Sequence, residues 1–252
     1  MGLQLMRLLI GVVLLIGLAQ PCQGAIAVVD HQVFGGTANS VTATMNCSGG
    51  NGIGGFLASY QGSTRPTIAN DSQGNTWNFG ADTEIASETR ITPIYASANP
   101  SLANGMTITA SGTSSFPAMY LVCTSGSDTA TWFDQQNGAA CTGAPTSCAT
   151  GNVTPTNSGA LVLAGFTDIT VVSSVTNDNG FSAIDGTAYS AGNHLSLYGS
   201  YLIHTSGAIQ TTYSWTTGAN VSAKTASFNA AAGGGGGGAA TSRNCLLLGV
   251  CP

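Results

Sequence analysis

Asp82, Glu84 and Glu88 form the densest group of carboxylates in the chain, within Asp82-Thr-Glu-Ile-Ala-Ser-Glu88. Enzymes that cleave polysaccharides commonly use two carboxylates at a fixed separation, and alternate residues of a strand place both on one face. Asp82 and Glu84 have that spacing, whereas Glu88 falls outside it if the strand ends at Ala86. We therefore keep a hydrolase or lyase as the least favoured function, and we expect a solvated acidic loop.

Serine hydrolysis is not indicated, because no Gly-x-Ser-x-Gly motif occurs and no helix is expected to follow one. The three histidines are His31, His194 and His204. The last two could share one face of a strand, but only if that strand continues through Gly199. Isolated histidines usually complete a core or its rim, so we expect structural roles for them.

Two tight turns could bind calcium through oxygen ligands. The residues 70–75 contain Asp71 and Asn75, and the residues 177–180 contain Asp178. Hard cations prefer such carboxylate and amide oxygens. Turn chemistry alone also explains both sequences, so we expect no cofactor but leave calcium open.

Aromatic residues offer a possible stacking platform for sugars, because a planar ring matches the apolar face of a pyranose. Trp77 and Trp215 lie in alternating strands and are expected in the core. For Trp132, both a core position and a ligand contact stay open. The residues that we name as candidate ligand contacts are Trp132, Asp134, Tyr198 and Tyr201.

Strand-like segments separated by turn residues fill the chain from Ala25 to Asn229. Neither helical periodicity nor a fixed repeat is present, which predicts an antiparallel, jelly-roll-like β-sandwich. Residues 26–34 and 41–48 are expected to form a first hairpin. Residues 116–124 are apolar at both odd and even positions, which predicts a strand buried on both faces. Residues 134–159 are expected to form an irregular loop closed by a disulfide.

Three short motifs carry a resemblance to known proteins: Asp71-Ser-Gln-Gly-Asn-Thr-Trp77, Ile94-Tyr-Ala-Ser97 and Gly105-Met-Thr-Ile-Thr-Ala-Ser111. They resemble a pattern in secreted bacterial β-sandwich proteins of largely unassigned function. Some similar modules stand beside carbohydrate-active or adhesive domains. The resemblance covers roughly residues 28–229. Its motifs consist of residues that are typical of turns and strands, and they do not indicate a ligand.

The first 24 residues combine Arg7 with an apolar run from Leu8 to Leu18, which is typical of a secretory signal peptide. Lipid attachment at Cys22 is a weaker interpretation, because Ala19-Gln20-Pro21 fits the required signal poorly. The run is too short to span a bilayer, so we expect no transmembrane anchor in the mature chain. We therefore predict a secreted or cell-surface protein.

Charged residues make up only 6% of the chain, and its net charge is −5. This composition excludes the basic surface that binds nucleic acid or anionic lipid. Six cysteines outside the signal favour disulfides in an exported protein, while the absence of Cys-x-x-Cys argues against zinc. We predict the pairs Cys141–Cys148, Cys245–Cys251 and Cys47–Cys123.

The chain divides into a signal peptide (1–24), a β-sandwich domain (25–229), an Ala/Gly-rich linker (230–240) and a short apolar tail (241–252). Six glycines at 233–238 predict a flexible linker. The tail either closes into a small knob or adds as a strand to a neighbouring molecule, so self-association through it stays open. Our preferred function is a non-catalytic module that binds glycan or adheres to a surface polymer. The alternative is a structural subunit of an extracellular assembly.

Overall fold

A computed structural model describes residues 25–69, 71–97, 99–170, 172–190 and 195–231, all of them within one compact unit. The signal peptide, His194, most of the linker, the tail and the predicted Cys245–Cys251 pair lie outside the described residues.

The described part of the chain is all β, and every strand pairing in it is antiparallel. The strands are β1 (Ala27–Gly35), β2 (Ser40–Asn46), β3 (Gly52–Tyr60), β4 (Trp77–Phe79), β5 (Thr83–Glu84), β6 (Thr89–Ala96), β7 (Asn104–Ser111), β8 (Ala118–Ser125), β9 (Phe133–Cys141), β10 (Ser147–Ala149), β11 (Ala160–Asp168), β12 (Asp185–Ser190), β13 (Leu195–His204), β14 (Thr212–Ser214) and β15 (Val221–Phe228). The predicted all-β class is therefore confirmed.

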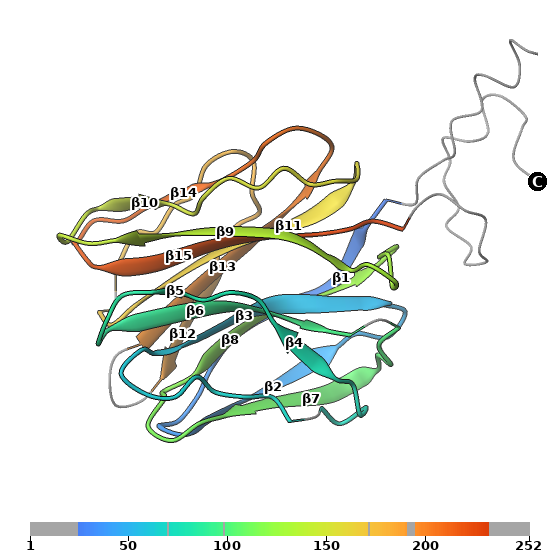
Figure 1. Ribbon diagram of the computed structural model, residues 1–252, viewed down its shortest axis with the longest axis horizontal. Coiled ribbons are helices and arrows are strands. Elements are labelled where there is room, and N and C mark those ends of the chain that lie inside the picture. Colours follow the sequence, from blue (N-terminus) through green and yellow to red (C-terminus); the bar gives the residue numbers. More distant parts are fainter. Residues whose placement is uncertain (1–24, 70, 98, 171, 191–194, 232–252) are drawn as a thin grey trace, which may run out of the picture. The chain divides into compact units, whose positions relative to one another are not determined.

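The strands form four sheets that stack as layers (Figure 1). A six-stranded sheet with the order β1-β8-β3-β6-β4, in which β5 also pairs with β6, faces a five-stranded sheet with the order β12-β13-β11-β15-β9. The pair β2-β7 covers the outer face of the first sheet, and β10-β14 covers the second. The sandwich thus has two principal sheets, each with a small covering sheet.

Six of the first eight strands pair in a nested order: β1 with β8, β2 with β7 and β3 with β6. This nesting, which arises when one long hairpin is rolled up, agrees with the jelly-roll-like prediction. The predicted first hairpin between residues 26–34 and 41–48 is wrong. The turn at residues 36–39 leads the chain into the covering sheet instead of back along β1.

Three apolar clusters fill the spaces between the layers. Phe56, Tyr120, Leu163 and Phe228 lie between the two principal sheets. A second cluster lies under β2-β7 and a third under β10-β14. Because both faces of a principal sheet are covered, β3, β8, β11 and β15 are buried at almost every position. The prediction that residues 116–124 are buried on both faces is confirmed.

Residues 134–159 do not form the predicted irregular loop, since they contain most of β9 and all of β10. Pairing with β15 gives β9 its backbone hydrogen bonds, although its sequence lacks apolar alternation. The disulfide Cys141–Cys148 joins these two strands as predicted. The predicted Cys47–Cys123 disulfide is also present and ties the end of β2 to β8.

Among the described residues, no helix is long and apolar enough to cross a membrane.

Candidate functional site

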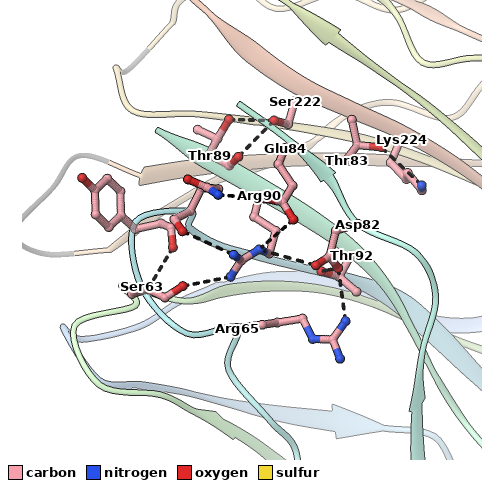
Figure 2. Close-up of polar contacts among 12 residues, drawn as sticks. Ser63, Arg65, Asp82, Thr83, Glu84, Thr89, Arg90, Thr92, Ser222 and Lys224 are labelled. Carbon is pink, nitrogen blue, oxygen red and sulfur yellow. Dashed lines mark hydrogen bonds and ion pairs between the residues drawn. The ribbon is translucent and has the colours of Figure 1, made fainter. Parts of the chain in front are cut away.

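The carboxylates Asp82 and Glu84 lie in a polar network built around Arg90 (Figure 2). Arg90 is only 8% exposed, and its Nε lies 3.5 Å from Asp82 and 3.6 Å from Glu84. Its terminal nitrogens donate to the carbonyl oxygens of Ser63 and Gln61. The guanidinium therefore fastens the segment after β3 to the β5–β6 hairpin. These contacts give Asp82 and Glu84 a structural function.

All three cations of the described residues gather at this place, namely Arg65, Arg90 and Lys224 (Figure 2). Arg65 lies 3.3 Å from Asp82. Lys224 is buried, and its Nζ donates to the Thr83 hydroxyl at 3.2 Å. Burial lowers the pKa of Lys224, while the negative charge of Asp82 acts in the opposite direction. The rest of the described surface is left without positive charge.

The calcium candidates are engaged by the chain itself. The Asp71 carboxylate accepts from the amides of Gln73 and Asn75, from the Asn75 side chain and from Trp77 Nε1, at 2.8–3.1 Å. These four bonds use the acceptor sites of a carboxylate. Gly74, with φ near 77°, completes the turn. Asp71 and Asn75 thus fix the turn before β4.

Asp178 has the same type of role in another turn. Its carboxylate accepts from the Thr211 hydroxyl at 3.0 Å and from the Thr212 amide at 2.7 Å. No group of three or more His, Cys, Asp or Glu residues in the described part of the chain could hold a metal ion. Turn stabilisation accounts for both calcium candidates, and calcium binding stays a prediction without added support.

Of the candidate ligand contacts, Trp132 directly precedes the edge strand β9 and Asp134 is the second residue of that strand. Trp132 is only 5% exposed, and its Nε1 donates to the Ile53 carbonyl oxygen at 3.2 Å. Its ring packs on Phe228, with ring centroids 4.8 Å apart. Asp134 accepts from both the amide and the hydroxyl of Thr156. Trp132 is therefore a core residue, and only a small part of it reaches the surface.

Tyr198 and Tyr201 differ in their surroundings although they are close in β13. Tyr198 is buried, stacks on Phe166 at 4.6 Å and donates its hydroxyl hydrogen to the Val172 carbonyl oxygen. The structure thus places Tyr198 in the core. Tyr201 faces the opposite side of β13 and packs against His31. Strand β13 continues through Gly199, which the sequence left in doubt.

A surface hollow of about 270 Å³ lies where β6 ends and β9 begins. Its lining residues are Asn78, Tyr95, Ala96, Ser97, Ala130, Thr131, Trp132 and Phe133. The rings of Tyr95 and Phe133 stack with an interplanar angle of 6° and centroids 4.7 Å apart. Partial burial raises the pKa of Tyr95, so its hydroxyl is protonated near neutral pH. The hollow therefore offers an aromatic wall with a hydroxyl group.

The polar side of the hollow consists of amides and hydroxyls. Asn78 donates to the Ser97 hydroxyl oxygen at 2.9 Å across the β4–β6 pair. On the opposite side, Thr131 donates to Asp128 at 2.7 Å, and these bonds lower the pKa of Asp128. No charged side chain is among the lining residues. Such a site fits a small neutral ligand with several hydroxyl groups.

Of the candidate ligand contacts named from sequence, only Trp132 reaches this hollow. Tyr95 and Ser97 stand in the Ile94-Tyr-Ala-Ser97 motif, at alternate positions near the end of a strand, which is the one local signal for them. Their approach to residues 130–133 depends on how the two principal sheets stack, so no sequence spacing indicates it. Comparison with family models, curated proteins and solved structures finds no match to this chain.

Proposed function

We propose that this protein is a secreted module that binds neutral glycans, and that the hollow beside Tyr95 holds one sugar unit. The observation that carries the proposal is the lining itself. A stacked tyrosine faces amide and hydroxyl groups, without a charged side chain among them. Aromatic rings match the C–H face of a pyranose, while amides and hydroxyls bond its rim.

The size and surroundings of the hollow support the same ligand class. Its volume of about 270 Å³ lies just below the range of typical pockets for drug-sized ligands, which suits a single sugar ring at a chain end. The nearby charged residues Asp128 and Asp134 are acidic, and like charges repel. A uronic or sialic acid is therefore disfavoured. This ligand-sized feature is why we rank binding above a purely structural subunit.

Export supports a function outside the cell. The apolar leader with Arg7 is typical of a signal peptide, and disulfides persist mainly in oxidising compartments. The solvent-facing side of the β2-β7 sheet carries threonines and no charged residues. This part of the surface is therefore rich in hydroxyl groups.

The test is retention on a panel of insoluble neutral polysaccharides, followed by calorimetric titration with oligosaccharides of the polymer retained. Tyr95→Ala should weaken binding about tenfold or more, which corresponds to about 1.4 kcal/mol. Tyr95→Phe keeps the ring and should have a smaller effect. Tyr60→Ala, which removes a half-buried tyrosine away from the hollow, is the matched control.

Trp132→Ala is a poor probe, because Trp132 supports the core and its loss would destabilise the fold. Retention of no neutral polysaccharide at all, or equal binding by the Tyr95→Ala variant, would show that the hollow is not a glycan site.

A further inference from the structure

The His31 imidazole is held by the Asp185 carboxylate where the edge strands β1 and β12 meet. His31 Nδ1 lies 3.0 and 2.9 Å from the two carboxylate oxygens, although the residues are 154 positions apart. The side chains are 35% and 18% exposed. Strand β1 ends the order of the six-stranded sheet and β12 that of the five-stranded sheet. This half-buried pair therefore joins the two principal sheets.

The pairing fixes which imidazole nitrogen can act as a base. A carboxylate only accepts hydrogen bonds, so Nδ1 must carry the proton that it donates to Asp185. In the neutral imidazole this leaves a lone pair on Nε2. A histidine that a carboxylate orients through Nδ1 presents Nε2 as the nitrogen that can act as a general base.

A buried phenol lies behind this pair. The Tyr120 side chain is fully buried, and its hydroxyl interacts with the Asp185 carboxylate. Its ring occupies the space that a side chain at Gly199 would need. Burial and then the negative charge of Asp185 raise the pKa of Tyr120 well above its ordinary value. The carboxylate that orients His31 is therefore also flanked by a buried phenol.

Tyr201 supplies a second phenol at the same edge. Its ring centroid is 4.9 Å from that of His31, with an angle of 60° between the planes. A phenol can donate a hydrogen bond to an oxyanion that forms next to the imidazole. Base, positioning carboxylate and donor thus come from β1, β12 and β13.

The charges nearby select the substrate class. Asp185 is negative, and the cations of the described residues gather around Arg90, in the part of the sheet formed by β5 and β6. A phosphate ester would meet repulsion without a compensating cation. A neutral carboxylic ester carries no charge, and its alkoxide leaving group needs only one proton.

We propose that His31 is the general base of an ester-hydrolysing site, with Asp185 as positioning residue and Tyr201 as oxyanion donor. Nε2 takes a proton from water while the water oxygen attacks the ester carbonyl carbon. The tetrahedral oxyanion accepts a hydrogen bond from Tyr201. The carbon–alkoxy bond then breaks, and the proton on Nε2 goes to the departing alkoxide to give an acid and an alcohol. This activity is independent of glycan binding at the hollow.

The experiment measures hydrolysis of p-nitrophenyl acetate by the full-length secreted protein. His31→Gln should lower kcat about 100-fold, within the range that general-base catalysis contributes. Asp185→Asn should lower kcat without raising KM and should change the pH dependence of the rate. His204→Gln is the matched control, because the His204 ring contacts the Gly207 carbonyl oxygen at an exposed turn and has no carboxylate partner among the described residues. Melting temperatures show whether each variant is folded.

The proposal predicts no hydrolysis of p-nitrophenyl phosphate. Equal rates for the wild type and a folded His31→Gln variant would overturn it, as would equal losses for His31→Gln and His204→Gln. Tyr201→Phe keeps the ring against His31 but removes the hydroxyl group. An unchanged kcat in this variant would show that Tyr201 is not the oxyanion donor.

Discussion

Asp168, at the end of β11, is a buried carboxyl group whose described partners are neutral. It is 0% exposed and accepts from the Ser196 hydroxyl at 2.6 Å and the Thr170 amide at 2.7 Å. Burial raises the pKa of Asp168 to about 6, and these hydrogen bonds offset part of the effect. Because the folded-state pKa lies above the ordinary value of 3.8, the folded state binds this proton more tightly than the unfolded state.

The stability of the protein should consequently fall as pH rises from about 4 to about 6, and the penalty should be complete above that range. Asp168→Asn removes the charge and should raise the free energy of unfolding at pH 7.5 by about 3 kcal/mol, since each pKa unit corresponds to about 1.4 kcal/mol. Urea unfolding of both proteins between pH 4 and pH 8 measures this. A variant less stable than the wild type at pH 7.5 would contradict the assignment.

Arg90 and Arg65 provide a matched pair, because both contact Asp82 but differ in burial. Arg90→Ala leaves two carboxylates without their buried partner and should cost about 3 kcal/mol of unfolding free energy. Arg65 is 38% exposed by its side chain, so Arg65→Ala should cost less than about 1 kcal/mol. Denaturant unfolding at pH 7 compares them. Equal losses would show that the network does not depend on the buried guanidinium.

At the scale of the elements, the two disulfides should contribute unequally. Both bridges join a covering sheet to a principal sheet, but Cys47–Cys123 closes 76 residues, whereas Cys141–Cys148 closes only 7. Chain entropy alone gives about 4.5 kcal/mol for the first and about 2.4 kcal/mol for the second. Double Cys→Ala variants of each pair, compared by thermal unfolding, should therefore rank in that order. A larger loss of stability without Cys141–Cys148 would show that this short bridge also stabilises contacts beyond those between β9 and β10.

The elements also show which parts of the fold a sequence pattern can predict. β13 and β15 can be recognised in the sequence, because runs of apolar and small residues fit strands buried on both faces. β9 was missed because Gln135-Gln136-Asn137-Gly138 has no such pattern; its extended form depends on pairing with β15. The nesting of β1 to β8 likewise depends on contacts between distant segments. The hollow and the His31–Asp185 pair cannot be predicted from local sequence patterns, because they too are formed by segments that are far apart in the chain.

At the scale of the whole molecule, the described residues form one unit with its own three apolar clusters. Six consecutive glycines at 233–238 impose a large entropy cost on ordering. Deletion of residues 233–252 should therefore leave the melting temperature nearly unchanged. A large drop in melting temperature would show that the tail is part of the core. Sedimentation of the same variant shows whether the tail mediates self-association.

Glycan binding at the hollow is tested most directly by nuclear magnetic resonance of the ¹⁵N-labelled protein, titrated with neutral oligosaccharides. The Trp132 indole N–H is a useful reporter, because Trp132 is one of the residues that line the hollow and its indole gives one of only three tryptophan signals. Saturable shifts should cluster at this signal and at the amides of residues 78, 95–97 and 130–133. Shifts that cluster elsewhere, or none at millimolar ligand, would contradict the proposed function.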